Sequence, residues 1–447
     1  AEGRRLGHDP LSALARFWYL GSKVEAAEAA ALIRPLKIAD LVSAGLVEQR
    51  DDRVRALVRI APMDELLVAH DFDRADTLAE DHVLGVGAAT RTLAALTPRR
   101  DVARALDVGT GNGAQALLAA AHADHVIATD INRRAVWLAR LNAALNGRTN
   151  VEVRAGDAFE PVAQDRFHLI VANPPFVVSP DQTLTFRDSP LGGEALSQAI
   201  VESAAAHLEP AGTACILANW VVRPGHSEVD APTAWVTGLD CDSLILHHDT
   251  LDPLAYAQRW MLAPAGGSAE AYEATLDRWL AYYAREGAAG IASGAIILRR
   301  IGQPTRRSRT RAFRMPRRPV DGGDHVERML RALGRFDGPG DPHLADATFA
   351  LVEPHDLEQR LTFEDGRYQA GEATLRLARS AGVEARVPAD LLEALFLVDG
   401  RRRLGDILDE VATTRDVSSP GLRIHGLPVF LSLFERGYLT IPESRAA

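Results

Sequence analysis

The sequence of 447 residues contains only two cysteines, Cys215 and Cys241, and only two lysines, Lys23 and Lys37. Two cysteines are too few for a disulfide framework or for a zinc site built from cysteines. No segment approaches the roughly twenty consecutive apolar residues of a membrane helix, so we expect no membrane span. The first ten residues carry charges with no apolar core behind them, so no secretory signal peptide is visible. Together these absences favour a cytoplasmic protein.

The composition is that of a folded chain with two or three domains. Hydrophobic residues make up 47% and charged residues 25%, as in globular domains, and the length exceeds one ordinary domain. The net charge is −10, yet residues 299–318 hold nine arginines and no acid. This stretch predicts a linker or extended arm whose charge could neutralise phosphates. Many arginines, alanines and glycines beside few lysines are typical of a high-GC bacterial genome.

A glycine-rich turn at residues 105–113, ALDVGTGNG, organises the rest of the chain. A short apolar run leads into the three alternating glycines, and an Ala/Leu-rich helical stretch follows at 114–121. Strand, glycine turn and helix in this order are typical of the opening of a doubly wound α/β domain. The glycines let the backbone approach a ligand closely, and we expect the helix N-terminus to offer it free N–H groups.

The segment 126–130, VIATD, predicts a second strand that ends in Asp130. This acid lies about twenty residues after the first glycine, where such domains place a carboxylate on ribose hydroxyls. The glycine spacing is GxGxG and differs from the GxGxxG that fits a dinucleotide pyrophosphate. The pattern therefore favours a nucleoside ligand without phosphates.

A third motif, VANPPF at 171–176, follows another apolar strand. The motifs DVGTGNG, ATDIN, AGDAF and ANPPF, in this order and spacing, resemble those of class I S-adenosylmethionine (SAM) dependent methyltransferases. The resemblance covers roughly residues 80–302. The NPPF motif is similar to that of enzymes that methylate planar nitrogens. These include release-factor glutamine, ribosomal-RNA guanine exocyclic-amine and adenine-N6 methyltransferases.

The resemblance implies SAM as the cofactor and assigns residues to it. Asp107 and residues 109–113 would surround the methionine part, with the Asp107 carboxylate near the ammonium. Asp130 would accept from the ribose hydroxyls. Ile131 would lie against the adenine, and Asp157 and Ala158 would bind its polar edge. The full implied set is Gly87, Asp107, Gly109, Thr110, Gly111, Asn112, Gly113, Asp130, Ile131, Asp157, Ala158 and Asn173.

The NPPF residues supply what the chemistry needs. Methyl transfer from a sulfonium needs little acid–base help, so the enzyme must chiefly align donor and acceptor. A planar nitrogen is a poor nucleophile until both of its N–H groups are held in acceptor bonds. The Asn173 side-chain carbonyl and the Pro174 backbone are the expected acceptors, made rigid by Pro174 and Pro175, and Phe176 offers a ring face for stacking. His247 and His248 lack a carboxylate or cysteine pattern, so we assign no metal.

We predict an α/β fold with a Rossmann-like, seven-stranded class I methyltransferase core. Strands are expected at 104–108, 125–130, 151–156, 167–172, 213–218, 243–248 and 295–301. Helices are expected near 112–121, 132–146 and 193–207. The aromatic-rich region 253–294 is longer than a connection needs and predicts a helical insertion. The polar segment 180–194 is a candidate lid.

Four regions are predicted along the chain. Residues 1–80 form an N-terminal winged-helix-like domain, with helices at 11–20, 24–32 and 36–45 and strands at 46–49 and 54–60. Residues 81–302 form the methyltransferase domain and 303–320 the Arg-rich linker. Residues 321–447 form a C-terminal α+β, winged-helix-like domain. Its strands are expected at 348–351, 360–364, 373–377 and 438–441, and its helices at 389–398, 404–412 and 427–437.

Three classes of acceptor stay open from the sequence. RNA is favoured by the arginine stretch and by winged-helix-like units, which often accompany nucleic-acid enzymes, although the chain is acidic overall. A protein glutamine is favoured by NPPF. A small molecule or peptide of specialised metabolism is the third class, with the terminal units serving pocket closure or a homodimer.

Overall fold

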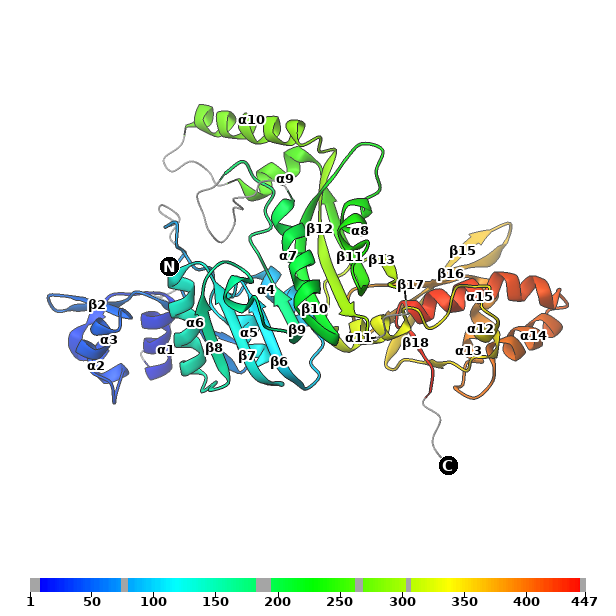
Figure 1. The fold of residues 1–447 in the computed structure, drawn as a ribbon, viewed down its shortest axis with the longest axis horizontal. Coiled ribbons are helices and arrows are strands. Elements are labelled where there is room, and N and C mark those ends of the chain that lie inside the picture. The colour runs from blue at the N-terminus through cyan, green and yellow to red at the C-terminus, as the bar shows by residue number, and fades with distance from the viewer. Residues whose placement is uncertain (1–8, 74–78, 182–193, 262–267, 303–306, 443–447) are drawn as a thin grey trace. The chain divides into compact units, whose positions relative to one another are not determined.

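The computed structural model describes residues 9–73, 79–181, 194–261, 268–302 and 307–442 (Figure 1). The chain forms two compact units. Unit 1 comprises Ala1–Arg91, Asp101–Ile200 and Leu254–Glu286, and unit 2 comprises Thr92–Arg100, Val201–Pro253 and Gly287–Ala447. None of the helices in the described ranges is long and apolar enough to cross a bilayer.

Eight strands form one sheet in the order β8-β7-β6-β9-β10-β12-β11-β13. The strands are β6 Val102–Val108, β7 Ala123–Asp130, β8 Val151–Ala155, β9 Phe167–Ala172, β10 Leu208–Val222, β11 Cys241–Leu251, β12 Gly290–Arg300 and β13 Thr310–Arg314. Counted from β6, the first seven have the order 3-2-1-4-5-7-6, and β12 runs antiparallel to both neighbours. The predicted α/β class with a seven-stranded core is confirmed, and one further strand is added.

Unit 1 contains the parallel strands β6 to β9. Val126, Ile127 and Ala128 of β7 are completely buried, as continuous apolar runs are in parallel sheets covered on both faces. Helix α5 (Ala114–Ala119) packs on β6 and β7, and α6 (Arg133–Leu145) packs on β7 and β8 (Figure 1). The strand order reverses between β6 and β9, and in such sheets the ligand crevice opens outside the carboxyl ends at that point.

The N-terminal part of unit 1 has the element order of a winged helix. It runs α1 (Pro10–Leu14), a π-helical turn (Ala15–Tyr19), β1 (Val24–Glu25), α2 (Ala26–Leu32), α3 (Ile38–Ser43), β2 (Val47–Arg50) and β3 (Arg53–Ala56). The strands pair in the order β1-β3-β2. Its core is small and apolar, with Phe17, Ala29 and Val54 at its centre.

A second hairpin follows that the sequence did not predict, formed by β4 (Arg59–Met63) and β5 (Leu66–His70). Its turn contains Asp64 at a φ of 52°, a conformation that aspartate tolerates better than most residues. Asn142 of α6 bonds both polar backbone atoms of Ala69, and Asn146 bonds both of Leu67. These side chains pair with β5 as a neighbouring strand would. Residues 66–70 are therefore bonded to a helix of the methyltransferase core.

Two helices form the insertion, α9 (Pro253–Trp260) and α10 (Ala269–Arg285). The prediction that it extends to residue 294 is wrong, because β12 already begins at Gly290. Glycine weakens a strand pattern, so the sequence placed this strand too late. Glycine is nevertheless required here, since a Cβ at Gly294 would lie 2.2 Å from the Leu246 carbonyl oxygen.

The predicted Arg-rich linker is also corrected in part by unit 2. Residues 310–314 form β13, which pairs in parallel with β11, so this part is an edge strand and no free arm. Its arginines meet acids: Arg311 bonds Glu435 at 2.8 Å, and Arg317 bonds Glu384 at 2.9 Å. Arg309 pairs with Asp337. The sequence could not show these partners because the acids lie 28 to 124 residues away.

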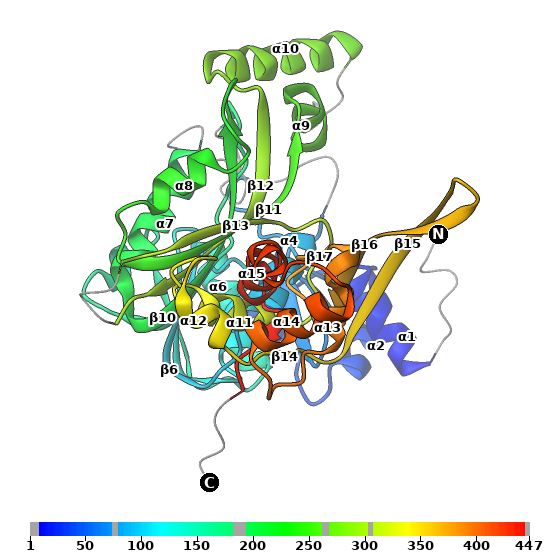
Figure 2. The same ribbon diagram turned by 90° about the vertical axis from the view of Figure 1, so that its right-hand side faces the viewer.

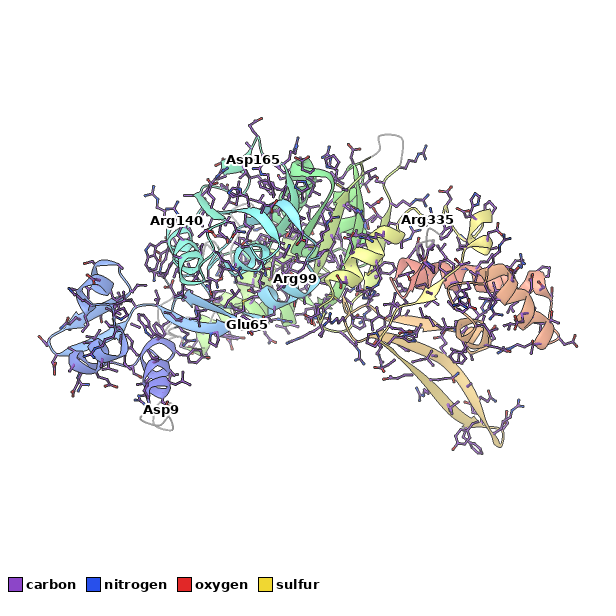
Figure 3. The ribbon with its side chains drawn as sticks, turned by 90° about the horizontal axis from the view of Figure 1, so that it is seen from below. Asp9, Glu65, Arg99, Arg140, Asp165 and Arg335 are labelled. Atoms are coloured by element: carbon purple, nitrogen blue, oxygen red, sulfur yellow. The ribbon has the colours of Figure 1, made fainter. Side chains whose placement is uncertain are left out.

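The remainder of unit 2 surrounds its own apolar core. It contains α11 (Gly323–Ala332), α12 (Pro342–Asp346), β14 (Ala350–Leu351), β15 (His355–Glu364), β16 (Arg367–Leu377), β17 (Ala385–Val387), α13 (Leu392–Phe396), α14 (Leu404–Thr414), α15 (Ser419–Glu435) and β18 (Leu439–Thr440). The β15–β16 hairpin extends away from helices α13 to α15 (Figure 2). The helix predicted at 427–437 begins earlier, at Ser419, with Pro420 in its first turn, where proline is tolerated, and Pro428 inside the helix.

Candidate active site

The glycine turn has the backbone that only glycine adopts without strain. Gly109, Gly111 and Gly113 have φ values of 65°, 57° and 84°, a region costly for residues with a Cβ. A Cβ on Gly113 would lie 3.1 Å from Ala139 Cα, whereas none of the described atoms lies within 4 Å of a Cβ on Gly109 or Gly111. The first two glycines therefore leave an open backbone surface, and the third permits close helix packing.

Asp107 lies at the carboxyl end of β6 and is almost fully buried. Its Oδ2 atom accepts from Thr110 Oγ1 at 2.5 Å and from the Ala116 N–H at 3.0 Å. Burial raises the pKa of this carboxyl to about 7, and the nearby charge of Asp130 acts in the same direction. A cation beside Asp107 would favour the ionised form.

The expectation of free N–H groups at the start of α5 is wrong for two of them. Ala114 N–H donates to Asn112 Oδ1 at 3.0 Å, and Ala116 N–H donates to Asp107. The chain thus caps this helix with its own side chains, which satisfies groups that a helix N-terminus otherwise leaves unpaired. Thr110 and Asn112 act as parts of this preformed loop.

Asp130 is the last residue of β7, and its side chain links the ATDIN motif to the glycine turn. Its Oδ2 accepts from Gly111 N–H at 2.8 Å, and its Oδ1 accepts from Asn132 N–H at 2.9 Å. Burial raises the pKa of this carboxyl as well. The neighbouring Ile131 is 59% exposed and lines a cavity of about 490 Å³ with Glu80, Asp81, Asn132 and Arg133. An exposed isoleucine at a cavity fits an adenine face.

The AGDAF residues lie beside Asp130. Gly156 N–H donates to the Asp130 carbonyl at 3.0 Å, and Thr129 Oγ1 donates to the Ala158 carbonyl at 2.8 Å. Asp157 lies between these two anchors and is exposed. The structure thus brings Asp130, Asp157 and Ala158 together at the ends of neighbouring strands.

Gly87 is exposed, with open space around the Cβ position. Its segment is joined to the glycine turn, because Asn112 Nδ2 donates to the Leu84 carbonyl at 2.8 Å and Gln115 Nε2 to the Thr90 carbonyl at 2.7 Å. Close packing requires a glycine at position 85 and not at position 87, since a Cβ on Gly85 would lie 2.6 Å from the His70 ring. The sequence prediction singled out Gly87 and did not see this constraint.

The NPPF turn follows directly after β9. Asn173 Oδ1 is buried and has no hydrogen-bond partner among the described residues, which typically costs about 1–3 kcal/mol. Pro174 is buried beside it, while Pro175 and the Phe176 ring are half-buried. Unpaired buried polar atoms are rare in native folds and need an explanation. An N–H from an acceptor substrate would provide one. Residues 182–193 of the predicted lid lie outside the described residues.

The sequence did not predict the two tyrosines that hydrogen-bond to the backbone just after the NPPF turn. Val178 N–H donates to Tyr256 Oη at 3.2 Å, and Tyr283 Oη donates to the Val178 carbonyl at 2.8 Å. The aromatic density of 253–294 was a signal for contacts of this kind, but not for their target. In the described part of the chain, no cluster of three or more His, Cys, Asp or Glu residues could hold a metal.

The residues fit SAM on observations of the chain itself. Gly109 and Gly111 leave an open backbone surface, Asp130 stands at the predicted ribose position, and Ile131 exposes its side chain. Asn173 Oδ1 has no hydrogen-bond partner among the described residues, at the position expected for the acceptor. No cysteine or metal cluster needs to be invoked for this set.

Comparisons with known proteins identify methyltransferase relatives of this chain. Residues 84–224 match the family "Methyltransferase small domain", and residues 2–57 match a domain of unknown function. A release factor glutamine methyltransferase from Xylella fastidiosa (strain Temecula1) is 33% identical over 191 residues, covering 39% of this chain and 67% of the relative. A ribosomal protein uL3 glutamine methyltransferase from Bradyrhizobium diazoefficiens is 40% identical over 79 residues, covering 17% and 25%.

A second release factor glutamine methyltransferase, from Aliivibrio fischeri, is 44% identical over 86 residues, covering 19% of this chain and 30% of the relative. The recognised motifs, the strand order and the extent of the match to the Xylella relative lead to one assignment. The chain belongs to the class I SAM-dependent methyltransferases, the family that includes the release factor glutamine methyltransferases.

Proposed function

We propose that this chain transfers a methyl group from SAM to the side-chain amide nitrogen of a protein. The observation that carries the proposal is the buried Asn173 Oδ1 directly after β9 and beside two prolines, which has no hydrogen-bond partner within the described ranges. An acceptor oxygen in that position suits a substrate that presents N–H groups. The relatives whose printed names include glutamine methyltransferase act on proteins, which supports an amide as the acceptor.

SAM supplies a methyl group on a sulfonium whose leaving group is neutral. Asp130 and the glycine turn bind the nucleoside and methionine parts, and their mutual hydrogen bond fixes this surface before binding. Asn173 Oδ1 and the Pro174 carbonyl would accept the two amide N–H groups and so orient the nitrogen lone pair toward the methyl donor, and the N–H proton that the methyl group replaces would pass to solvent water. Phe176 stacks on the amide plane. Alignment of this kind supplies most of the acceleration.

The arginine stretch gives less support to RNA than the sequence suggested. Arg309, Arg311 and Arg317 are each paired with an acid of unit 2, so their charges are partly neutralised within the chain. Affinity for nucleic acid depends on cations that remain available to phosphates. A protein acceptor is therefore favoured over RNA, and the relatives give no support to a small-molecule acceptor.

The test is transfer of labelled methyl from SAM to the protein, RNA and small-molecule fractions of a strain lacking this protein. The purified full chain should label the protein fraction, and the label should be resistant to ribonuclease. The same chain carrying Asn173→Ala is the control and should leave that fraction unlabelled. Label found in RNA or in small molecules would overturn the proposed acceptor.

A further inference from the structure

Helices α9 and α10 place a cluster of aromatic residues next to the NPPF turn. The Trp260 ring meets the Phe176 ring edge-on, with centroids 6.3 Å apart and planes 83° apart. Both residues are half-buried, and the Arg259 guanidinium lies 5.9 Å from the centroid of the Trp260 ring. The second aromatic ring at the acceptor site therefore comes from the insertion and not from the motif.

The insertion also hydrogen-bonds to the backbone immediately after the NPPF motif. Tyr256 accepts from the Val178 N–H at 3.2 Å, and Tyr283 donates to the Val178 carbonyl at 2.8 Å. Val178 lies only two residues after Phe176 and directly after the bridge residue Val177. Two phenol groups thus satisfy both polar backbone atoms of Val178.

Tyr256 and Tyr283, which hydrogen-bond to Val178, also pack against other aromatic rings. Tyr256 and Tyr283 meet edge-on at 6.0 Å, and Trp279 and Tyr282 meet Tyr283 at 6.2 Å and 5.6 Å. Tyr256, Tyr283 and Trp279 are at most 2% exposed. Such edge-to-face contacts add about 0.5–1.5 kcal/mol each beyond burial. Tyr256, Tyr283 and Trp279 form the most deeply buried part of the cluster, and Trp260 is its half-buried member.

We propose that α9 and α10 form the acceptor-side wall of the methyl-transfer site. Trp260 and Phe176 contact the planar amide group of the substrate. Tyr256 and Tyr283 are positioning residues that hold Val178, and through it the turn that carries Asn173. This inference rests on the proposed function, because it names the residues that recognise the acceptor of that same site.

The recognition claim is tested with Trp260→Ala and Trp260→Phe in the full chain. With the deletion-strain protein fraction as the acceptor, Trp260→Ala should raise the apparent KM for that fraction by about tenfold or more. Trp260→Phe should restore most of the loss, since it keeps a ring. The Kd for SAM, measured by calorimetry, should stay within twofold. An unchanged KM in Trp260→Ala, or an equal loss of SAM affinity, would overturn the claim.

The positioning claim is tested with Tyr256→Phe and Tyr283→Phe, which keep the rings and remove one hydroxyl each. Tyr272→Phe on the exposed side of α10 is the matched control. The first two variants should lower kcat by about tenfold with little change in KM, and Tyr256→Phe should speed amide exchange at Val178 by about tenfold. Behaviour equal to Tyr272→Phe in both kcat and exchange would refute the role.

The proposed acceptor and the role of the insertion are tested by different outcomes. If the wild-type chain labels RNA or small molecules, the proposed acceptor is wrong, and the same variants are then measured on the fraction that is labelled. If it labels nothing, the Trp260 claim falls with the proposed function. Exchange at Val178 needs no substrate and decides the positioning contact in either case.

Discussion

At the ends of β6 and β7, Asp107 and Asp130 already accept hydrogen bonds from their own chain, whereas at the end of β9 the Asn173 oxygen accepts none from the described residues. The cofactor side is thus a closed network of short-range contacts. The acceptor side has an open hydrogen-bonding position and is supported by residues 78 to 105 positions away. On the proposed function, the first half is preformed before SAM binds, and the second is completed by the substrate.

Among the predicted effects, that of Asn173→Ala should be the largest, and it tests whether the acceptor side acts separately from the cofactor side. It removes an acceptor used only when substrate is present, so kcat should fall by about 10²–10³-fold, as loss of one preorganised catalytic group typically does. SAM affinity measured by calorimetry should change less than threefold. Loss of SAM binding in this variant would mean that Asn173 belongs to the cofactor side.

Asp130→Ala should affect the opposite half. It removes the proposed ribose acceptor and the bond to Gly111 N–H, so the Kd for SAM should rise about 10–100-fold, the value of one or more charge-assisted hydrogen bonds. At saturating SAM, kcat should recover to within a few-fold of wild type. A large loss of kcat that persists at saturating SAM would show that the cofactor side and the acceptor side do not act separately.

The pH dependence of SAM affinity should report Asp107. Its pKa of about 7 means that the carboxylate is increasingly protonated below neutrality, and only the ionised form holds an ammonium. Affinity should therefore fall with decreasing pH, approaching tenfold for each unit well below 7. Asp107→Asn should bind SAM more weakly and show a flat profile between pH 5.5 and 8.

The same carboxyl predicts an opposite trend in stability without SAM. Its pKa is higher in the folded chain than the ordinary value of 3.8, so the folded state holds the proton more tightly. The stabilising contribution of this group is present below about pH 4 and is lost as pH rises to 7. Thermal unfolding at pH 8 should show Asp107→Asn to be more stable than wild type. An equal or lower Tm would contradict the burial argument.

The last prediction concerns stability and compares Asn142 of α6 with Asn146, the residue that caps the end of this helix. Asn142 is fully buried and bonds Ala69 twice and the Asn112 carbonyl once, whereas Asn146 bonds Leu67 near the surface. Asn142→Ala should cost about 3 kcal/mol of unfolding free energy and Asn146→Ala about 1 kcal/mol. Denaturant unfolding measures both. Only Asn142→Ala should weaken SAM binding, because only that side chain reaches the glycine turn.

Some features of the site were predicted from the sequence, and others were not. The strands that lead to Asp107, Asp130 and Asn173 were found because parallel strands are continuous apolar runs that end in turn or polar residues. The Asn112–Ala114 cap was missed because it depends on side-chain direction within a turn. Tyr256 and Tyr283 could not be assigned, since their contacts with Val178 join distant segments. The strand at 310–314 was mistaken for an arm because five arginines of 307–317 dominate its pattern while their acidic partners lie far away.

The position of the transferred methyl group tests the central claim most directly. Mass spectrometry of the protein labelled by the wild-type chain should place the methyl group on a side-chain amide nitrogen, and the Asn173→Ala chain should leave the same residue unmodified at matched SAM occupancy. A methyl group on a carboxylate, a lysine amine or a nucleotide, or equal modification by both chains, would contradict an acceptor amide held by Asn173.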